Sequence, residues 1–226
     1  MKLSQKTLSI LKNFSTINSG IMFKKGTILS TVSPQKNILA DAHIEEMIPQ
    51  DFGIYSLSGF LSVVSLFKEG AELEFESKNI IIKGMNGRSK IKYRCADPSM
   101  IVVAPEKRPN LPSIDVSFLF SEENFDWIMR TANILGCPNI AIESDGTNVN
   151  LVAFDVTDDS SHSNYTTLPD IKPEGNEYKL IFKTENLKML PRTYNVEISS
   201  KGIAKFVDKD NELIYYVTLE TSSVYN

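Results

Sequence analysis

The chain has 226 residues, of which 42% are hydrophobic and 23% charged, a composition typical of a folded globular protein and not of a disordered one. It carries 24 Lys and Arg against 28 Asp and Glu, and the net charge of −4 argues against DNA binding by overall positive charge. Two cysteines, Cys95 and Cys137, exclude a disulfide framework and fit a reducing cytosol. We expect neither a signal peptide nor a membrane span, since every apolar run is far shorter than about 20 residues.

The first half of the chain alternates helical and strand-like patterns. Residues 4–14 predict an amphipathic helix, because apolar residues such as Leu11 and Phe14 share one side of a helical wheel. Strand-like runs follow at 17–24, 27–32, 38–47 and 51–55, and a second helix is expected over 57–67. Three further strands are expected near 71–76, 79–83 and 90–95, with Asn86–Gly87 as a hairpin-type turn before the last.

A proline-rich segment divides the chain. Residues 96–112 contain Pro98, Pro105, Pro109 and Pro112, four of the ten prolines in the sequence. Because proline fixes φ and removes a hydrogen-bond donor, this segment is expected to be an extended connector. We therefore predict an N-terminal domain over 1–95, a connector over 96–112 and a C-terminal domain over 113–226.

The second half repeats the order of the first. A strand at 113–120 precedes a helix at 122–135, which Ser121 caps and Gly136 and Pro138 end. Asp145–Gly146 predicts a hairpin between strands at 140–143 and 148–156. Strands near 164–171 and 177–182, a short helix over 184–190, and strands near 194–199, 204–207 and 212–220 complete the chain. Two similar halves of helices and antiparallel strands predict an α+β fold with helices packed on one face of the sheets.

Residues suited to catalysis are few and scattered. The two histidines, His43 and His162, stand apart from cysteines and acids at metal-ligand spacing and are expected on the surface. The run Asp158–His162 contains Asp, Ser and His, but a catalytic triad is assembled from separate elements, so a solvated loop is expected. We predict no catalytic residue, no metal ligand and no cofactor.

Positive charge is concentrated on the helices, although the whole chain is acidic. The first helix presents Lys2, Lys6 and Lys12 with no acid, and the short helix brings Lys183, Lys188 and Arg192 against Glu185 alone. These faces are either ordinary solvated helix surfaces or phosphate-facing surfaces. The third helix differs, because Glu122, Glu123 and Asp126 outnumber Arg130. Trp127 and Ile134 on its outward side suggest packing against a sheet or a subunit.

Several short motifs, spread along most of the chain, can be considered together. They are Lys12–Met22, Ile54–Leu61, the connector segments Ala96–Ser99 and Val102–Pro105, Leu187–Met189 with a proline two residues on, and Ala204–Phe206. In their sum and spacing these motifs resemble the sliding clamps of T4-type bacteriophages. Residues 143–175 diverge from that family's pattern.

The resemblance implies a DNA polymerase processivity factor and not an enzyme. Clamps of this kind are closed rings of six like domains, so a two-domain chain makes the ring as a homotrimer, with helices lining the hole and sheets outside. The implied partners are double-stranded DNA, encircled without sequence preference, the replicative DNA polymerase, a clamp-loader ATPase and late-transcription proteins. The implied location is the cytoplasm of an infected bacterial host.

Two sets of site residues follow from this resemblance. The DNA-facing set is Lys2, Lys6, Lys12, Arg130, Lys183, Lys188 and Arg192. A pocket for partner peptides is expected beside the connector, with Ile101, Val102, Val103, Pro105, Leu111, Leu213, Tyr215 and Tyr216 as its lining. The connector side chains have a second interpretation, in which they only pin the connector to the domains.

Two other classes of protein stay open. A β-rich oligomeric structural protein of a phage tail or baseplate would share the strands but would have no need of acid-free helix faces. A small hydrolase would need clustered carboxylates with a histidine, which the sequence does not place together. Binding of a polymerase tail peptide would separate a clamp from a structural protein.

Overall fold

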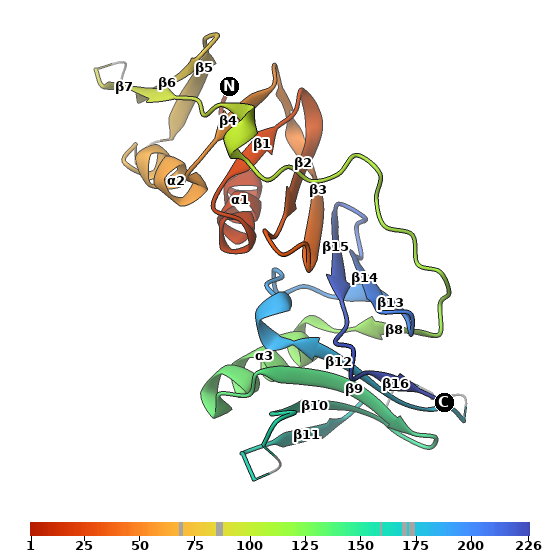
Figure 1. The fold of residues 1–226 in the computed structure, drawn as a ribbon. Helices are drawn as coiled ribbons and strands as arrows, with labels where there is room; N and C mark the ends of the chain where they lie inside the picture. Colours follow the sequence, from red (N-terminus) through yellow and green to blue (C-terminus); the bar gives the residue numbers. More distant parts are fainter. Residues whose placement is uncertain (68–69, 85–87, 159, 169–170, 172–174) are drawn as a thin grey trace. The chain divides into compact units, whose positions relative to one another are not determined.

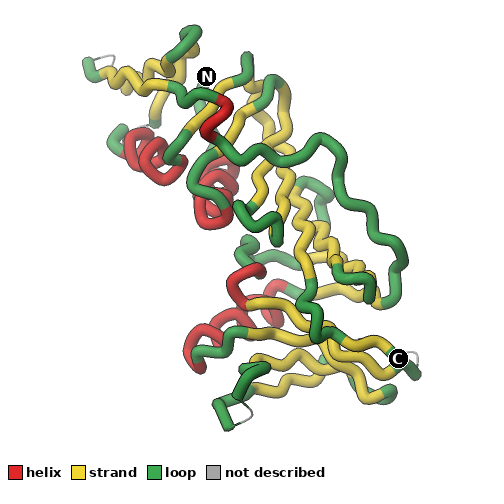
Figure 2. Tube along the Cα trace, in the orientation of Figure 1, coloured by secondary structure: helices red, strands yellow, loops and turns green. Residues whose placement is uncertain are grey.

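The computed structural model describes residues 1–67, 70–84, 88–158, 160–168, 171 and 175–226 (Figures 1 and 2). The chain forms two compact units, Met1–Lys107 (unit 1) and Arg108–Asn226 (unit 2). The division falls inside the proline-rich segment 96–112. Figure 2 shows helices and several strands in each unit. The predicted turn at Asn86–Gly87 lies outside the described residues.

Two helices of unit 1 begin at serine caps. α1 (Gln5–Ile17) follows Ser4, whose side chain accepts a hydrogen bond from the backbone N–H of Thr7. α2 (Leu57–Ser65) follows Ser56, which accepts in the same way from Gly59. Such caps satisfy N–H groups that the first turn of a helix leaves without partners. The helices pack against each other, and α1 also packs on β2 (Gly26–Val32) and β3 (Ile38–Ile48).

Within unit 1 the strands pair with antiparallel neighbours. Their bounds are β1 (Ile21–Phe23), β2 (Gly26–Val32), β3 (Ile38–Ile48), β4 (Phe52–Ile54), β5 (Ala71–Phe75), β6 (Asn79–Gly84) and β7 (Lys90–Arg94). β1 pairs with β4, β2 with β3, and β5, β6 and β7 form a meander. A 3₁₀ turn, η1 (Pro98–Met100), follows in the proline-rich segment.

Unit 2 contains two antiparallel groups of strands. The elements are β8 (Val116–Phe120), α3 (Glu122–Leu135), β9 (Asn139–Asp145), β10 (Val149–Phe154), β11 (Asn164–Thr167), β12 (Glu177–Lys183), η2 (Thr184–Asn186), β13 (Tyr194–Ser199), β14 (Ile203–Asp208), β15 (Leu213–Thr218) and β16 (Val224–Tyr225). One group has the order β11-β10-β9-β12-β16 and the other the order β8-β13-β14-β15. α3 covers β9 and β10 (Figure 1).

Aromatic side chains fill the core of each unit. In unit 1 Phe23 and Phe52 stack with ring centroids 4.5 Å apart. In unit 2 the fully buried Tyr194 meets Phe206 and Tyr215 edge to face, at centroid distances of 6.2 and 6.0 Å. Edge-to-face contacts add to the free energy gained from burying the rings. These rings join strands within each unit, and Phe125 of α3 also meets Tyr194 edge to face at 6.1 Å, which holds that helix against the sheet.

The α+β class with antiparallel sheets is confirmed, and most predicted elements appear with small shifts of their ends. The predicted helix over 184–190 is wrong, because only the 3₁₀ turn η2 forms there and an irregular segment follows it. Within its described residues unit 2 therefore has one α-helix and not two. Packing of Trp127 and Ile134 on a sheet of the same unit is also wrong, because these side chains are 56% and 83% exposed.

Candidate nucleic-acid interface

The exposed side of α1 carries lysines and no carboxylate of its own. Its buried residues, Thr7, Ile10, Leu11, Phe14 and Ile17, all face the core. Lys12 is left exposed and Lys6 half-buried at the surface. Because α1 contains no Asp or Glu, no side chain of the helix offsets the attraction of these ammonium groups for phosphate.

Glu46 of β3 secures the beginning of this helix. Its carboxylate accepts hydrogen bonds from the backbone N–H of Ser4 and from the hydroxyl of Thr7, the latter at 2.6 Å. Burial alone would raise the pKa of Glu46, but the hydrogen bonds from Thr7 and Ser4 outweigh burial and lower it. The carboxylate is therefore ionised at neutral pH, next to the positive end of the helix dipole.

Lys2 lies on a different element from the one that the sequence predicted. The helix begins only after Ser4, and Lys2 instead forms an isolated antiparallel bridge with Glu72 of β5. The neighbouring Met1 amino group donates to the carbonyl of Leu73 at 2.8 Å. Lys2 is thus an exposed residue at the edge of the β5-β6-β7 sheet and not part of the α1 face, which corrects the prediction.

Arg130 of α3 lies among carboxylates. Its guanidinium is 2.8 Å from Asp126, one helical turn away, and its side chain is 73% exposed. The same surface hollow is lined by Glu122 and Glu123. A phosphate at this place would meet more negative than positive charge, so the local electrostatics do not favour the predicted DNA contact.

Lys183 and Lys188 come together at the end of α3. Both line a hollow of about 1010 Å³, together with Asn133 of α3 and the carboxylates of Glu185 and Glu220. The ammonium of Lys183 is 4.0 Å from Glu220. The structure thus brings two predicted lysines to one surface, where part of their charge is balanced by neighbouring acids.

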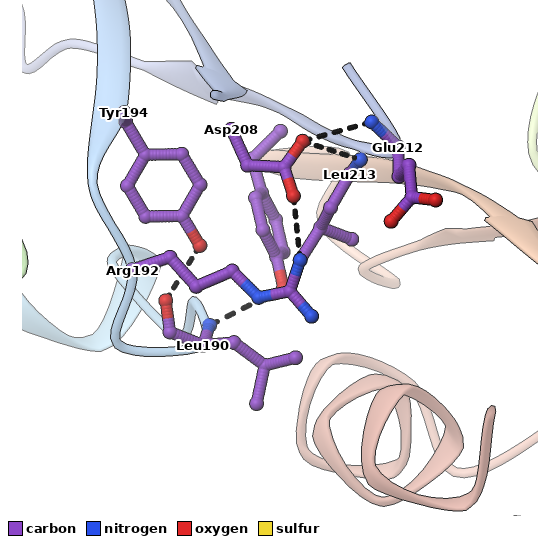
Figure 3. A network of polar contacts seen from close by, with 7 residues as sticks. Leu190, Arg192, Tyr194, Asp208, Glu212 and Leu213 are labelled. Atoms are coloured by element: carbon purple, nitrogen blue, oxygen red, sulfur yellow. Dashed lines mark hydrogen bonds and ion pairs between the residues drawn. The ribbon is translucent and has the colours of Figure 1, made fainter. Parts of the chain in front are cut away.

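Arg192 is engaged in an ion pair with a buried carboxylate (Figure 3). Its Nη1 lies 2.5 Å from Oδ2 of Asp208, and Asp208 is only 1% exposed. The other carboxylate oxygen of Asp208 accepts from the backbone N–H groups of Glu212 and Leu213 at 2.8 and 3.0 Å. Since removing a partner from a buried ion pair is costly, the guanidinium is tied to the fold.

The connector part of the predicted peptide pocket is pinned to unit 1 and partly exposed. Ile101 is 8% exposed and packs on Gly53. A Cβ added to Gly53 would lie only 2.5 Å from Cδ1 of Ile101. The amide of the buried Asn18 donates to the carbonyl of Val102 at 3.2 Å, while Val102 and Val103 are each 44% exposed. Ile101 is therefore an anchor, and the two valines are available to a partner. Asn18, which caps the end of α1, was missed in the sequence.

The remaining residues of the predicted pocket differ in accessibility. Leu213 and Tyr215 have no exposed surface in the core of unit 2, so their predicted role as a pocket wall is wrong. Tyr216 points to the opposite face of β15 and is half-exposed. Pro105, in unit 1, is exposed, and Leu111, in unit 2, is half-exposed.

The groups with chemical reactivity lie in ordinary surroundings. His43 and His162 are exposed, as predicted. Burial raises the pKa of both thiols, of Cys95 and of Cys137, so they are protonated at neutral pH. In the run 158–162 the Asp158 carboxylate accepts from the backbone and hydroxyl of Ser160, as in a surface turn, and Asp159 lies outside the described residues.

Three carboxylates of unit 2 lie close together at the turn between β14 and β15. Within the described residues, carboxylate oxygens of Asp208, Asp210 and Glu212 lie within 4.8 Å of one another. Asp208 already bonds Arg192 and two backbone N–H groups, so this cluster stabilises the β14–β15 turn.

None of the described helices has both the length and the apolar character that crossing a membrane requires.

Comparison with known sequences places the whole chain in one family. The family described as DNA polymerase processivity factor matches residues 2–103, and the gp45 sliding clamp, C terminal, matches residues 118–221. The sliding clamp of Enterobacteria phage T4 is 34% identical over 232 residues, covering 100% of both chains. The sliding clamp of Vibrio phage KVP40 is 30% identical over 97% of this chain and 99% of its own.

Solved structures agree on the fold at much lower sequence identity. PCNA from Entamoeba histolytica has a TM-score of 0.69 at 14% identity, covering 94% of each chain. A. fulgidus PCNA, solved with the C-terminal region of FEN-1, has a TM-score of 0.66 at 16% identity, covering 99% of this chain and 98% of its own. Full-length similarity to phage clamps and a shared clamp fold lead to one conclusion: this chain belongs to the sliding clamps, the processivity factors of DNA polymerase.

Proposed function

We propose that three copies of this chain close into a ring around duplex DNA and that α1 meets the DNA backbone through Lys6 and Lys12. The acid-free exposed face of α1, on a chain of net charge −4, is the observation that carries this proposal. Lysine–phosphate contacts are independent of sequence and weaken with salt. They are suited to a ring that stays on DNA by topology and slides along it.

The negative charge elsewhere supports the same mechanism. Glu122, Glu123 and Asp126 on α3 repel phosphate, so DNA is not held tightly around the whole ring. Of the seven predicted DNA-facing residues, Lys6, Lys12, Lys183 and Lys188 remain our proposed contacts.

The chain then acts by tethering the polymerase to DNA and catalyses no reaction. A closed ring must be opened to admit DNA, so a clamp-loader ATPase is a proposed partner in the bacterial host cytoplasm, with late-transcription proteins as further partners.

The DNA contact is tested by the double substitution Lys6→Gln and Lys12→Gln. Binding of a labelled duplex is measured by fluorescence anisotropy over a range of salt concentrations. The slope of log affinity against log salt should fall by about 0.9 for each lost phosphate contact, which is about 1.8 for each chain of the ring that meets the DNA. The matched control is Lys25→Gln with Lys36→Gln, which removes the same charge from exposed loops of unit 1. A slope unchanged in the α1 variant, with the ring intact, would overturn the assignment.

For the polymerase, we propose a tail-peptide contact at Val102 and Val103. The connector backbone is held by Asn18 while both valines stay exposed, which gives an ordered apolar surface. The PCNA of A. fulgidus was solved with the C-terminal region of FEN-1, which is a precedent for tail capture by a clamp. Val103→Asp should weaken binding of a fluorescent polymerase-tail peptide by at least about tenfold. Retained peptide affinity in a correctly assembled ring would move the pocket elsewhere.

A further inference from the structure

The segment between η2 and β13, Leu187–Arg192, holds a lysine in a fixed place without being a helix. We call it the Lys188 loop. Leu187 and Met189 are 3% and 6% exposed, and Lys188 between them is exposed. The N–H of Met189 donates to the carbonyl of Leu187 at 2.8 Å. The two buried side chains therefore fix the loop against unit 2 and direct Lys188 to the surface.

Two buried tyrosines take both backbone polar groups of Leu190. The hydroxyl of Tyr194 donates to the carbonyl of Leu190 at 2.5 Å (Figure 3), and the N–H of Leu190 donates to the hydroxyl of Tyr215 at 3.3 Å. Burial raises the pKa of both tyrosines, so the hydroxyls stay neutral at any ordinary pH. In a helix the backbone itself would bond these groups, so the tyrosines replace the missing helical bonds.

The end of the loop is secured by Arg192. Its guanidinium joins Asp208 at the end of β14, and Asp208 in turn accepts from the N–H groups of Glu212, in the turn, and of Leu213, the first residue of β15. The side chain of Arg192 is 29% exposed. A guanidinium that is paired with a buried carboxylate is poorly placed to turn toward a phosphate, because the buried carboxylate would then lose its ion-pair partner.

We propose that Arg192 is a positioning residue and not a phosphate contact: with Asp208, Tyr194 and Tyr215 it holds the Lys188 loop so that Lys188 meets the DNA backbone from a preset position. Preordering matters because a mobile loop would lose conformational entropy on each encounter with DNA. The inference rests on the proposed DNA-encircling function, since it assigns the task of Lys188 within it. It changes the predicted DNA-facing role of Arg192.

The two possible roles of Arg192, phosphate contact and positioning residue, predict opposite effects of Asp208→Asn on duplex affinity. The asparagine oxygen can still accept from Glu212 and Leu213, but the charge that holds Arg192 is gone. If Arg192 contacted phosphate, the freed guanidinium and the less negative chain would both strengthen duplex binding. We expect the opposite, a loss of at least about fivefold in affinity at 0.1 M salt and a salt slope lower by about 0.9, the contribution of one phosphate contact, for each chain that meets the DNA.

A double-mutant cycle gives a second, independent readout. Lys188→Gln and Arg192→Gln each remove one positive charge per chain, and each alone should reduce the salt slope of duplex binding by about 0.9 for each chain that meets the DNA. If Arg192 acts through Lys188, the double variant should be no weaker than either single variant. Additive losses, with a slope reduced by about 1.8 for each chain that meets the DNA, would overturn the proposal.

Controls keep folding separate from function. Tyr194→Phe tests the loop without changing charge and should lower affinity in the wild type but not in the Lys188→Gln background. Tyr225→Phe is the matched control, because the Tyr225 hydroxyl donates to Asp115 and not to the loop. Absence of duplex binding by the wild-type ring would overturn the proposed function itself. Wild-type binding that Asp208→Asn leaves equal or stronger would overturn only the positioning role.

Discussion

Side-chain direction within β15 separates residues that stabilise unit 2 from residues that can meet a partner. Leu213 and Tyr215 point inward and Tyr216 points outward, as the alternation of a strand requires. The sequence interpretation placed all three on one pocket wall, and the period of two alone could have excluded that. The role of Arg192 was harder to predict, because its partner Asp208 is 16 residues away and joins it only through the β13–β14 pairing.

Tyr215 and Tyr216 should respond very differently to truncation. Tyr215→Ala removes a fully buried ring that packs on Tyr194 and should lower the free energy of unfolding by about 3–5 kcal/mol. Tyr216→Ala removes a half-exposed ring and should cost less than about 1 kcal/mol. Urea denaturation followed by circular dichroism measures both. Equal losses would contradict the inward placement of Tyr215.

Helix prediction succeeded where the end signals were local and failed where they were not. α3 has its cap at Ser121, acids in its first turn and a left-handed Gly136 after its last residue, all within one segment. The segment 184–190 is too short for its periodicity to decide, and a short helix has a costly nucleus. Its backbone finds partners in Tyr194 and Tyr215, which a local pattern cannot contain.

The start of α1 depends on a carboxylate from another element, and this makes it sensitive to acid. Glu46→Gln should lower the free energy of unfolding by about 1 kcal/mol at pH 7, because charged hydrogen bonds to Ser4 and Thr7 become neutral. The folded-state pKa of Glu46 is lowered, so its contribution is present above the ordinary carboxyl range and lost as pH falls through the folded value. The difference between variant and wild type should therefore shrink on acidification.

Urea denaturation at pH 7 and at about pH 3 measures this difference. Glu45→Gln is the matched control, since Glu45 is the adjacent carboxylate on β3 and its side chain is exposed. A Glu46 effect that stays constant between the two pH values would show that the carboxylate charge is not what secures the helix.

For the whole molecule, the arrangement of charge is more informative than its sum. A net charge of −4 argues against nucleic-acid binding, yet α1 presents lysines without an acid, while α3 begins with acids. The order of elements and the family could be predicted because the clamp-like motifs run along most of the chain. The set of phosphate contacts could not, because carboxylates from distant segments, such as Glu220 beside Lys183, lie next to the predicted lysines.

Ring formation predicts a definite mass in solution. Among the described residues, β7 ends one sheet of unit 1 and β11 ends one sheet of unit 2, so each leaves a strand edge with unpaired backbone groups. Edges of this kind favour pairing between copies, and head-to-tail contacts that close give a ring. Light scattering over a wide range of concentrations should therefore find a species of about three times the 25.3 kDa chain mass. A monomer at every concentration would remove the ring, and with it the topological hold on DNA, while leaving the fold of each unit unchanged.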